Sequence, residues 1–149
     1  MFDARQRNEI GILMLIEILC TGDEILTGKT VNTNYSHMAR RFGEVGLTMH
    51  WSTVVGDDRS CLTTAFQQAS QRADAVIVNG GLGPTVDDLS QEVAAEAAGV
   101  GLILDENWLS RMLDFYERRG RTMPPNNKKQ AMLPAVSYTH LTLPTKWIV

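Results

Sequence analysis

Short apolar runs alternate along the chain with segments whose apolar residues recur at helical spacing. Runs bounded by turn residues predict strands over residues 15–20, 48–55 and 75–78. The helical pattern predicts helices over residues 35–44, 59–71, 87–98, 106–119 and around 127–132. This alternation is typical of βαβ units, so it predicts an α/β fold with a mostly parallel sheet.

Several local signals refine these elements. The run over residues 75–78 is wholly apolar, which suits the centre of a sheet covered on both faces. Thr85 and Asp88 have the spacing of a capping box for the helix over residues 87–98, and Gly99 suits its C-terminus. Pro134 is expected to end the last helix.

Composition limits the class of protein. The 149 residues suffice for one domain with a single core, and 44% hydrophobic and 21% charged residues are ordinary for a globular protein. A formal net charge of −3 argues against a nucleic-acid partner. The apolar run over residues 10–20 is too short to span a bilayer and contains Glu17. We therefore expect no membrane partner and a cytoplasmic location, with Cys20 and Cys61 as reduced thiols.

The two ends of the chain differ from its middle. Met14 is a natural start, so residues 1–13 are expected to be a non-native or disordered extension. The tail over residues 136–149 resembles translated adapter or vector sequence. The alternative is a genuine strand, because its threonines and leucines are typical of strands. The predicted domain therefore covers residues 14–135.

Polar loops follow each of the three predicted strands. Thr21, Gly22 and Asp23 come after the first strand with Asn34 further on, and residues 56–58 come after the second. Residues 79–88 follow the third strand. Ligands of open α/β sheets bind at the carboxyl ends of strands, so these loops are expected to meet at one edge.

The third loop, Gly80–Gly83, is the most informative. Its three glycines leave backbone N–H groups bare enough to approach an anion, and a helix N-terminus after it adds its dipole. Alternatively, the glycines after the strand form only a tight turn and bind no ligand. The adjoining Pro84, Thr85 and Asp87-Asp88 favour a phosphate-binding loop.

The acidic pairs Asp57-Asp58 and Asp87-Asp88 have two interpretations. They are either helix caps or ligands of a divalent cation, because carboxylates near a bound phosphate would repel it unless a cation lies between them. We favour a metal-bridged site.

Five motifs in order resemble the N-terminal domain of CinA-like proteins, a branch of the MoaB/Mog molybdopterin-binding superfamily. They span roughly residues 14–135, and they are Thr21-Gly-Asp-Glu-Ile-Leu-Thr-Gly28, Asn32-Thr-Asn34, Val55-Gly-Asp-Asp58, Asn79-Gly-Gly-Leu-Gly-Pro-Thr-Val-Asp-Asp88 and Asn127-Lys-Lys-Gln-Ala131 with Pro134. Leu82 stands where the adenylyltransferase relatives have Thr, which favours the CinA-like branch.

The resemblance implies a three-layer α/β/α domain that binds a pterin or nucleotide phosphate. Some members of the branch hydrolyse ADP-ribose with a divalent metal. Full-length members also have a separate C-terminal nicotinamide-mononucleotide deamidase domain. We do not expect its activity in this chain. The family also continues past the Pro134 region, so we expect the C-terminal part of the domain to be missing and the chain itself to be inactive.

The resemblance thus implies metal-dependent hydrolysis of the ADP-ribose pyrophosphate by the parent protein, with Mg or Co as the metal. Molybdopterin binding or adenylylation is one alternative, and a non-catalytic nucleotide-binding or oligomerisation module is another. The parent is expected to be a homo-oligomer. We assign catalysis to Asp58 and Asp88, and metal binding to Asp23, Asp57 and Asp87. Ligand binding is assigned to Thr21, Gly22, Asp23, Asn34, Gly80, Gly81, Leu82, Gly83, Thr85, Ser90 and Lys129.

Overall fold

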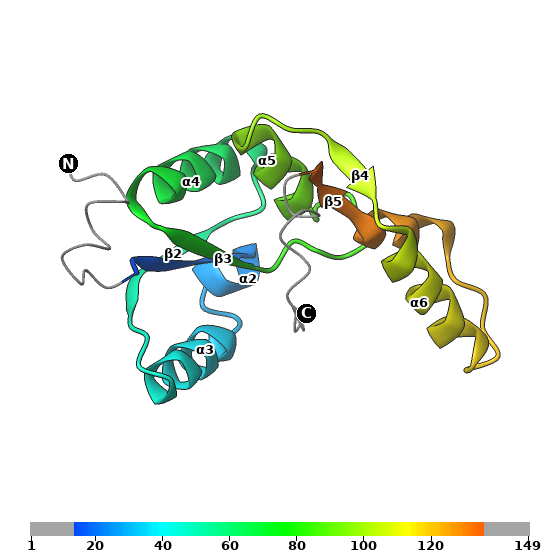
Figure 1. The fold of residues 1–149 in the computed structure, drawn as a ribbon, viewed down its shortest axis with the longest axis horizontal. Coiled ribbons are helices and arrows are strands. Elements are labelled where there is room, and N and C mark those ends of the chain that lie inside the picture. The colour runs from blue at the N-terminus through cyan, green and yellow to red at the C-terminus, as the bar shows by residue number, and fades with distance from the viewer. Residues whose placement is uncertain (1–13, 136–149) are drawn as a thin grey trace. The chain divides into compact units, whose positions relative to one another are not determined.

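A computed structural model describes residues 14–135 of the chain (Figure 1). The chain divides into two compact units, Met1–Asn79 and Gly80–Val149. The predicted extension over residues 1–13 and the predicted tail over residues 136–149 lie outside the described residues.

The first unit is built on a parallel sheet of three strands. Its order is β2 (Met49–Val55), β1 (Ile16–Thr21) and β3 (Ala75–Asn79). The prediction that residues 75–78 form the centre of the sheet is wrong, because β1 pairs on both sides and all six of its residues are buried. An apolar run alone did not distinguish the strand with two neighbours from the strand with one.

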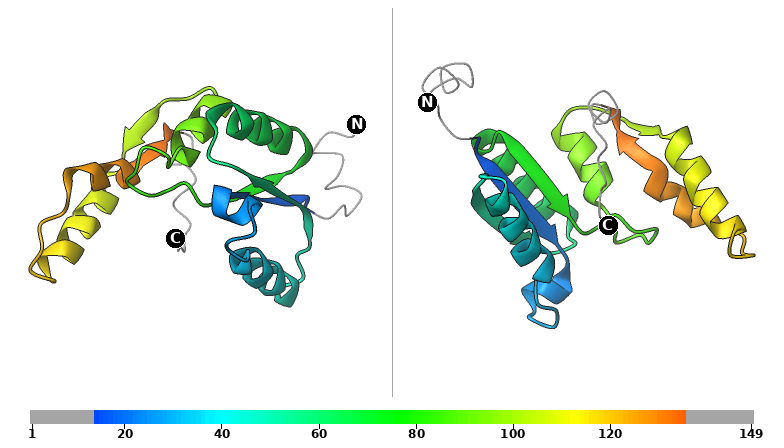
Figure 2. Two further views of the ribbon diagram at one scale, coloured as in Figure 1. Left: turned by 180° about the vertical axis from the view of Figure 1, so that it is seen from behind. Right: turned by 60° about the horizontal axis from the view of Figure 1, so that its bottom comes forward.

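Helices cover both faces of this sheet, which gives the predicted three-layer α/β/α arrangement (Figures 1 and 2). The helix α4 (Arg59–Arg72) buries Leu62, Ala65, Phe66 and Ala69, the residues with helical spacing. On the other face lies α3 (Thr33–Glu44), which begins where Asn32 Oδ1 accepts the Tyr35 N–H at 3.0 Å. The short helix α2 (Asp23–Leu26) was not predicted.

One charged group lies in the centre of the sheet. The Glu17 side chain has no solvent exposure, and Arg72 donates to it from Nε at 2.8 Å and from Nη2 at 2.6 Å. Thr53 Oγ1 adds a third donor at 2.6 Å. This cluster joins β1, β2 and the C-terminal end of α4, and it satisfies a carboxylate that would otherwise be costly to bury.

The second unit contains two helices, a 3₁₀ segment and a small antiparallel sheet. Its elements are α5 (Ser90–Ala97), β4 (Leu102–Leu104), α6 (Glu106–Glu117), η1 (Pro125–Ala131) and β5 (Met132–Pro134). Strands β4 and β5 pair through Leu102 and Pro134, Ile103 and Leu133, and Leu104 and Met132.

Two predicted elements of this unit need correction. The helix expected around residues 127–132 is a 3₁₀ segment followed by a strand, because Met132–Pro134 finds a partner in β4. The helix expected from Asp87 begins only at Ser90, and no side chain caps it. Thr85 and Asp88 bond to each other within the loop instead of forming a capping box.

Candidate functional site

The first two predicted loops meet at the carboxyl ends of β1 and β2. Gly22 N donates to Val55 O at 3.1 Å, which joins the ends of the two strands. Asp23 N donates to Asp57 Oδ2 and Asp57 N donates to Asp23 Oδ1, each at 3.3 Å. A side chain at Gly56 would collide with the Asp23 carboxylate. The topology of the parallel sheet thus brings together two of the predicted metal ligands.

The carboxylates of Asp23 and Asp57 could supply some of the oxygen ligands that a hard divalent cation requires. Mg²⁺ in proteins is commonly held by one or two carboxylates, with waters and substrate phosphates completing its shell. Asp23 and Asp57 supply two such groups at an exposed position. Within residues 14–135, no group of three or more His, Cys, Asp or Glu side chains is placed to hold a metal ion. Asp87 is an exposed residue of the second unit. The three-carboxylate metal set therefore remains a prediction.

The same edge of the sheet holds two further predicted ligand-binding residues. Asn34 Nδ2 donates to Asn79 Oδ1 at 3.1 Å, so the end of β3 positions the start of α3. Thr21 is 3% exposed, and its Oγ1 has no hydrogen-bond partner in the described part of the chain. A buried hydroxyl without a partner is uncommon in folded proteins, which sets Thr21 apart from the other residues of β1.

Two of the three glycines in the loop have a backbone conformation that favours glycine. Gly80 and Gly81 have φ values of 109° and 63°, which residues with a Cβ rarely adopt. The Gly81 carbonyl accepts the Ser90 N–H at 3.1 Å. The N–H groups of Gly81 and Leu82 donate to no other group among the described residues. Backbone amides of this kind are suited to bind an anion.

Asp88 lies inside this loop. Its Oδ2 accepts from Thr85 N at 2.8 Å and from Thr85 Oγ1 at 2.6 Å, and a Cβ on Gly83 would lie 2.5 Å from it. Burial raises the pKa of Asp88, but the hydrogen bonds from Thr85 and the Gly83 N–H, with the Lys129 charge, lower it further than burial raises it. Asp88 therefore remains ionised and shapes the loop, and its catalytic role stays a prediction.

Asp58 is the N-cap of α4. Its Oδ1 accepts from Ser60 Oγ at 2.6 Å and from Cys61 N at 2.9 Å. The Ser60 hydroxyl and then the Cys61 N–H lower the pKa of Asp58 to about 2. The capping alternative thus describes Asp58, and its assignment to catalysis stays a prediction.

The 3₁₀ segment η1 contacts the glycine loop through two consecutive side chains. Lys129 Nζ donates to Thr85 O at 3.1 Å and lies 3.3 Å from Glu92 Oε1. Gln130 Nε2 donates to Leu82 O at 3.3 Å. The motif Asn127-Lys-Lys-Gln-Ala131 suggested Lys129 alone, so Gln130 was missed. The adjoining Ser90 is 1% exposed, and its Oγ has no hydrogen-bond partner in residues 14–135.

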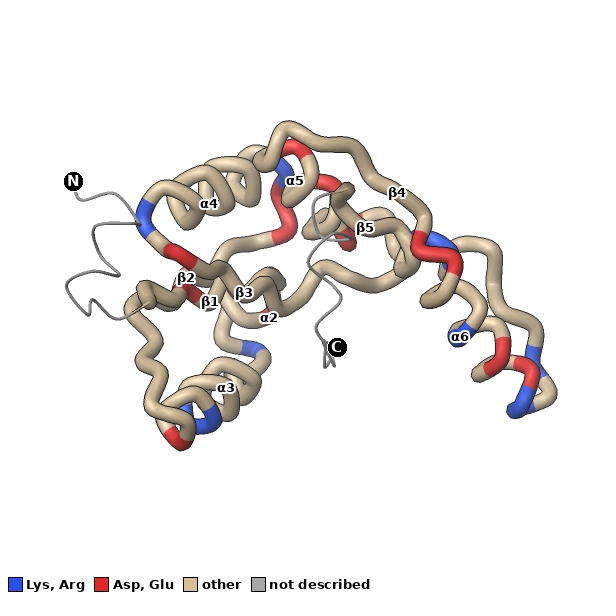
Figure 3. Tube along the Cα trace, in the orientation of Figure 1, with Lys and Arg blue, Asp and Glu red and all other residues tan. Residues whose placement is uncertain are grey.

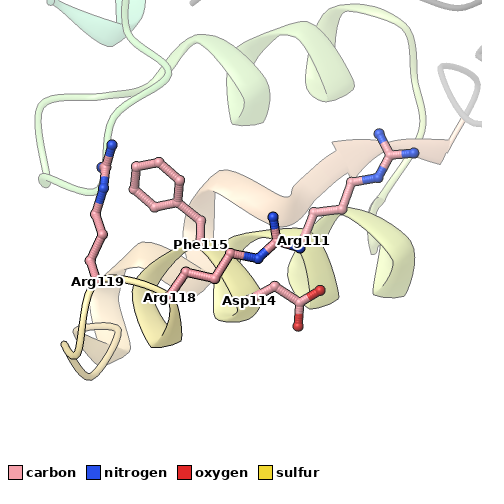
Figure 4. A pocket seen from close by; sticks show the side chains of 5 residues that line it. All are labelled: Arg111, Asp114, Phe115, Arg118 and Arg119. Carbon is pink, nitrogen blue, oxygen red and sulfur yellow. The ribbon is translucent and has the colours of Figure 1, made fainter.

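Charges of both signs alternate along α6 and elsewhere, with no long run of Lys and Arg (Figure 3). A hollow of about 420 Å³ lies against α6, and it is lined by Arg111, Asp114, Phe115, Arg118 and Arg119 (Figure 4). The Arg119 guanidinium lies 3.7 Å from the centre of the Phe115 ring. None of the predicted site residues lines this hollow. Among the helices within residues 14–135, none has the length and apolar character needed to cross a bilayer.

A match to a family model agrees with this α/β fold. Residues 17–145 match the model of a family described as "Probable molybdopterin binding domain", and the chain belongs to this family. The matched range runs past residue 135, where the sequence predicts the native domain to end.

The relatives place the chain in the CinA-like branch. It is 49% identical over 123 residues to the CinA-like protein of Escherichia coli (strain K12 / DH10B) and to the NMN amidohydrolase-like protein YfaY of Escherichia coli (strain K12). Each match covers 83% of this chain and 31% of the relative. The chain therefore spans about a third of the length of these curated relatives.

Solved structures agree with this placement. The protein CinA from Thermoplasma acidophilum is 33% identical, with a TM-score of 0.71 over 83% of this chain and 72% of that one. The molybdopterin biosynthesis enzyme MoaB from Thermus thermophilus is 18% identical, with a TM-score of 0.52 over 80% of this chain and 73% of that one. The second likeness shows the fold alone.

Proposed function

We propose that the glycine loop binds the phosphate of a nucleotide or pterin ligand. The observation that carries this proposal is the backbone of Gly80–Leu82. Two consecutive glycines with positive φ leave the Gly81 and Leu82 N–H groups without an acceptor among the described residues. The unpartnered hydroxyl of Ser90, whose N–H bonds to Gly81 O, supports it. Backbone amides bind phosphate without a basic side chain, which suits a chain with a net charge of −3.

As the finer form of this proposal, the ligand is ADP-ribose and the reaction is hydrolysis of its pyrophosphate. Asp23 and Asp57 would hold the divalent cation, Mg or Co, because they are the carboxylates that the sheet brings together. Such a cation would lower the pKa of a bound water. Asp88 is the proposed catalytic carboxylate nearest in sequence to the loop, and its lowered pKa keeps it in the basic form.

Molybdopterin binding is the second candidate, and membership of the molybdopterin-binding family favours it. The same loop amides would hold the terminal phosphate of the pterin. ADP-ribose and molybdopterin share a phosphate and differ in the rest of the molecule. A competition experiment between the two ligands therefore shows which one binds more tightly.

Calorimetry with ADP-ribose and with molybdopterin, each with and without Mg²⁺, tests the proposal. We expect Gly81→Val to abolish binding, because a β-branched side chain resists φ near +63° and occupies the space of the phosphate. Gly120→Val is the matched control, since Gly120 also has a φ of 63° but lies in the turn after α6. Equal affinity in the wild type and the Gly81→Val chain would refute phosphate binding at the loop.

A further inference from the structure

The carbonyl groups of the glycine loop are held from outside the loop. Gly81 O accepts from Ser90 N at 3.1 Å, Leu82 O from Gln130 Nε2 at 3.3 Å, and Thr85 O from Lys129 Nζ at 3.1 Å. In a planar trans peptide the C=O and the following N–H point in opposite directions. Holding a carbonyl therefore also fixes the direction of the next N–H.

The peptide between Leu82 and Gly83 is held at both ends. Gln130 holds its carbonyl, and its N–H donates to the Asp88 carboxylate. The preceding peptide is held only through Gly81 O, which leaves the Leu82 N–H directed away from that bond. Rotation of the Leu82–Gly83 peptide would turn the backbone beside this N–H, so Gln130 acts on the geometry of the amides that face a ligand.

The direction of the Gln130 side-chain amide depends on Asn127. Asn127 Nδ2 donates to Gln130 Oε1 at 3.2 Å and to Tyr116 OH at 2.9 Å. With its oxygen bonded to Asn127, Gln130 directs its NH₂ group to Leu82 O. A chain of hydrogen bonds thus runs from α6 through η1 to the glycine loop.

We propose that Gln130 is a positioning residue of the glycine loop and that Asn127 sets its orientation. This proposal rests on the proposed function, in that the loop positioned by Gln130 is the one assigned to phosphate binding. Neither residue touches the ligand. Their effect is to keep the Leu82–Gly83 peptide in the orientation that presents the loop amides.

Asn127→Asp tests this without changing any residue that contacts the loop. A carboxylate at position 127 accepts hydrogen bonds only, so the Gln130 amide turns its NH₂ group towards it and its oxygen towards Leu82 O. The bond to the loop is then lost. Asn126→Asp is the matched control, because it makes the same charge change at an exposed position of η1.

Two readouts on the 149-residue chain separate this proposal from the proposed function. The first is the amide hydrogen exchange of Gly83, whose N–H donates to Asp88, without ligand. We expect Asn127→Asp and Gln130→Leu each to accelerate it about tenfold, and Asn126→Asp to leave it unchanged. The second is the Kd of ADP-ribose with Mg²⁺. We expect each variant to raise it about tenfold and the double variant to raise it no further, since both changes remove one interaction.

Unchanged exchange in both variants overturns the positioning role, and so does an ADP-ribose Kd that stays constant while the urea midpoint falls. Additive effects in the double variant overturn the role given to Asn127. If the wild-type chain binds no ADP-ribose, the finer proposed function fails, and the exchange rates alone then support or overturn the role of Gln130.

Discussion

The buried carboxylate of Glu17 gives the sharpest prediction about stability. The variant Glu17→Gln keeps the shape of the side chain and removes its charge. In the wild type, Arg72 and Thr53 donate three hydrogen bonds to the two Glu17 oxygens. The variant replaces one of these oxygens by an NH₂ group, which cannot accept, so at least one of the three bonds is lost. Hydrogen bonds to charged groups contribute about 1.5–3 kcal/mol. We expect the free energy of unfolding to fall by about that amount, a large part of the roughly 5–15 kcal/mol typical of domains.

Urea unfolding at pH 7, followed by circular dichroism, measures this loss. Glu44→Gln is the matched control, because Glu44 pairs with Arg41 on the surface with 49% and 65% of the two side chains exposed. That variant is expected to cost at most about 0.5 kcal/mol. Arg72→Met should cost more than Glu17→Gln, because it leaves a buried carboxylate without its cationic partner.

The dependence of this difference on pH provides the refuting result. The hydrogen bonds from Arg72 lower the pKa of Glu17 below its ordinary value of 4.5, and they prevail over burial, which raises it. A depressed folded-state pKa gives stability that is present above pH 4.5 and is lost as the pH falls through the folded pKa. The wild type and Glu17→Gln should therefore converge in stability on acidification. A difference that stays constant or grows below pH 4.5 would show that the ionised carboxylate does not stabilise the fold.

Three further substitutions test individual assignments. Asp58→Ala should lower the urea midpoint while Asp58→Asn preserves it, because Asn caps helices as well as Asp does; a loss of ADP-ribose turnover in the full-length parent carrying Asp58→Asn, at unchanged stability, would support a catalytic role as well. In the full-length parent protein, Asp88→Asn should lower ADP-ribose turnover much more than stability, since the amide is a poor base; persisting turnover leaves Asp88 with a loop role only. Gly83→Ala should weaken ADP-ribose binding in calorimetry, because its Cβ would lie 2.5 Å from Asp88 Oδ2; unchanged affinity would separate that contact from binding.

The sequence predicted the first unit better than the second, for physical reasons. The strands of the parallel sheet have five to seven residues each, long enough to be recognised from their composition. Strands β4 and β5 have three residues each, and Pro134 argues against a strand. The start of α5 was misplaced because the spacing of Thr85 and Asp88 serves a capping box and a loop turn equally well.

The candidate site likewise has features that the sequence predicts and one that it does not. The meeting of Asp23 and Asp57 follows from parallel strand topology, whereas glycine only permits the positive φ seen at Gly81 and does not impose it. Gln130 reaches Leu82 across 48 positions of the chain. No local pattern encodes such a contact, so only the folded structure shows what holds the loop.

Phosphate binding by the backbone amides of the glycine loop is tested most directly by titrating the ¹⁵N-labelled chain with ADP-ribose and Mg²⁺. Amides that form hydrogen bonds to phosphate oxygens shift downfield in the proton dimension. We expect saturable downfield shifts of the Gly81 and Leu82 amides, and their absence in Gly81→Val. Saturable shifts confined to Arg111, Arg118 and Arg119 beside the α6 hollow, with the loop amides unmoved, would contradict the claim.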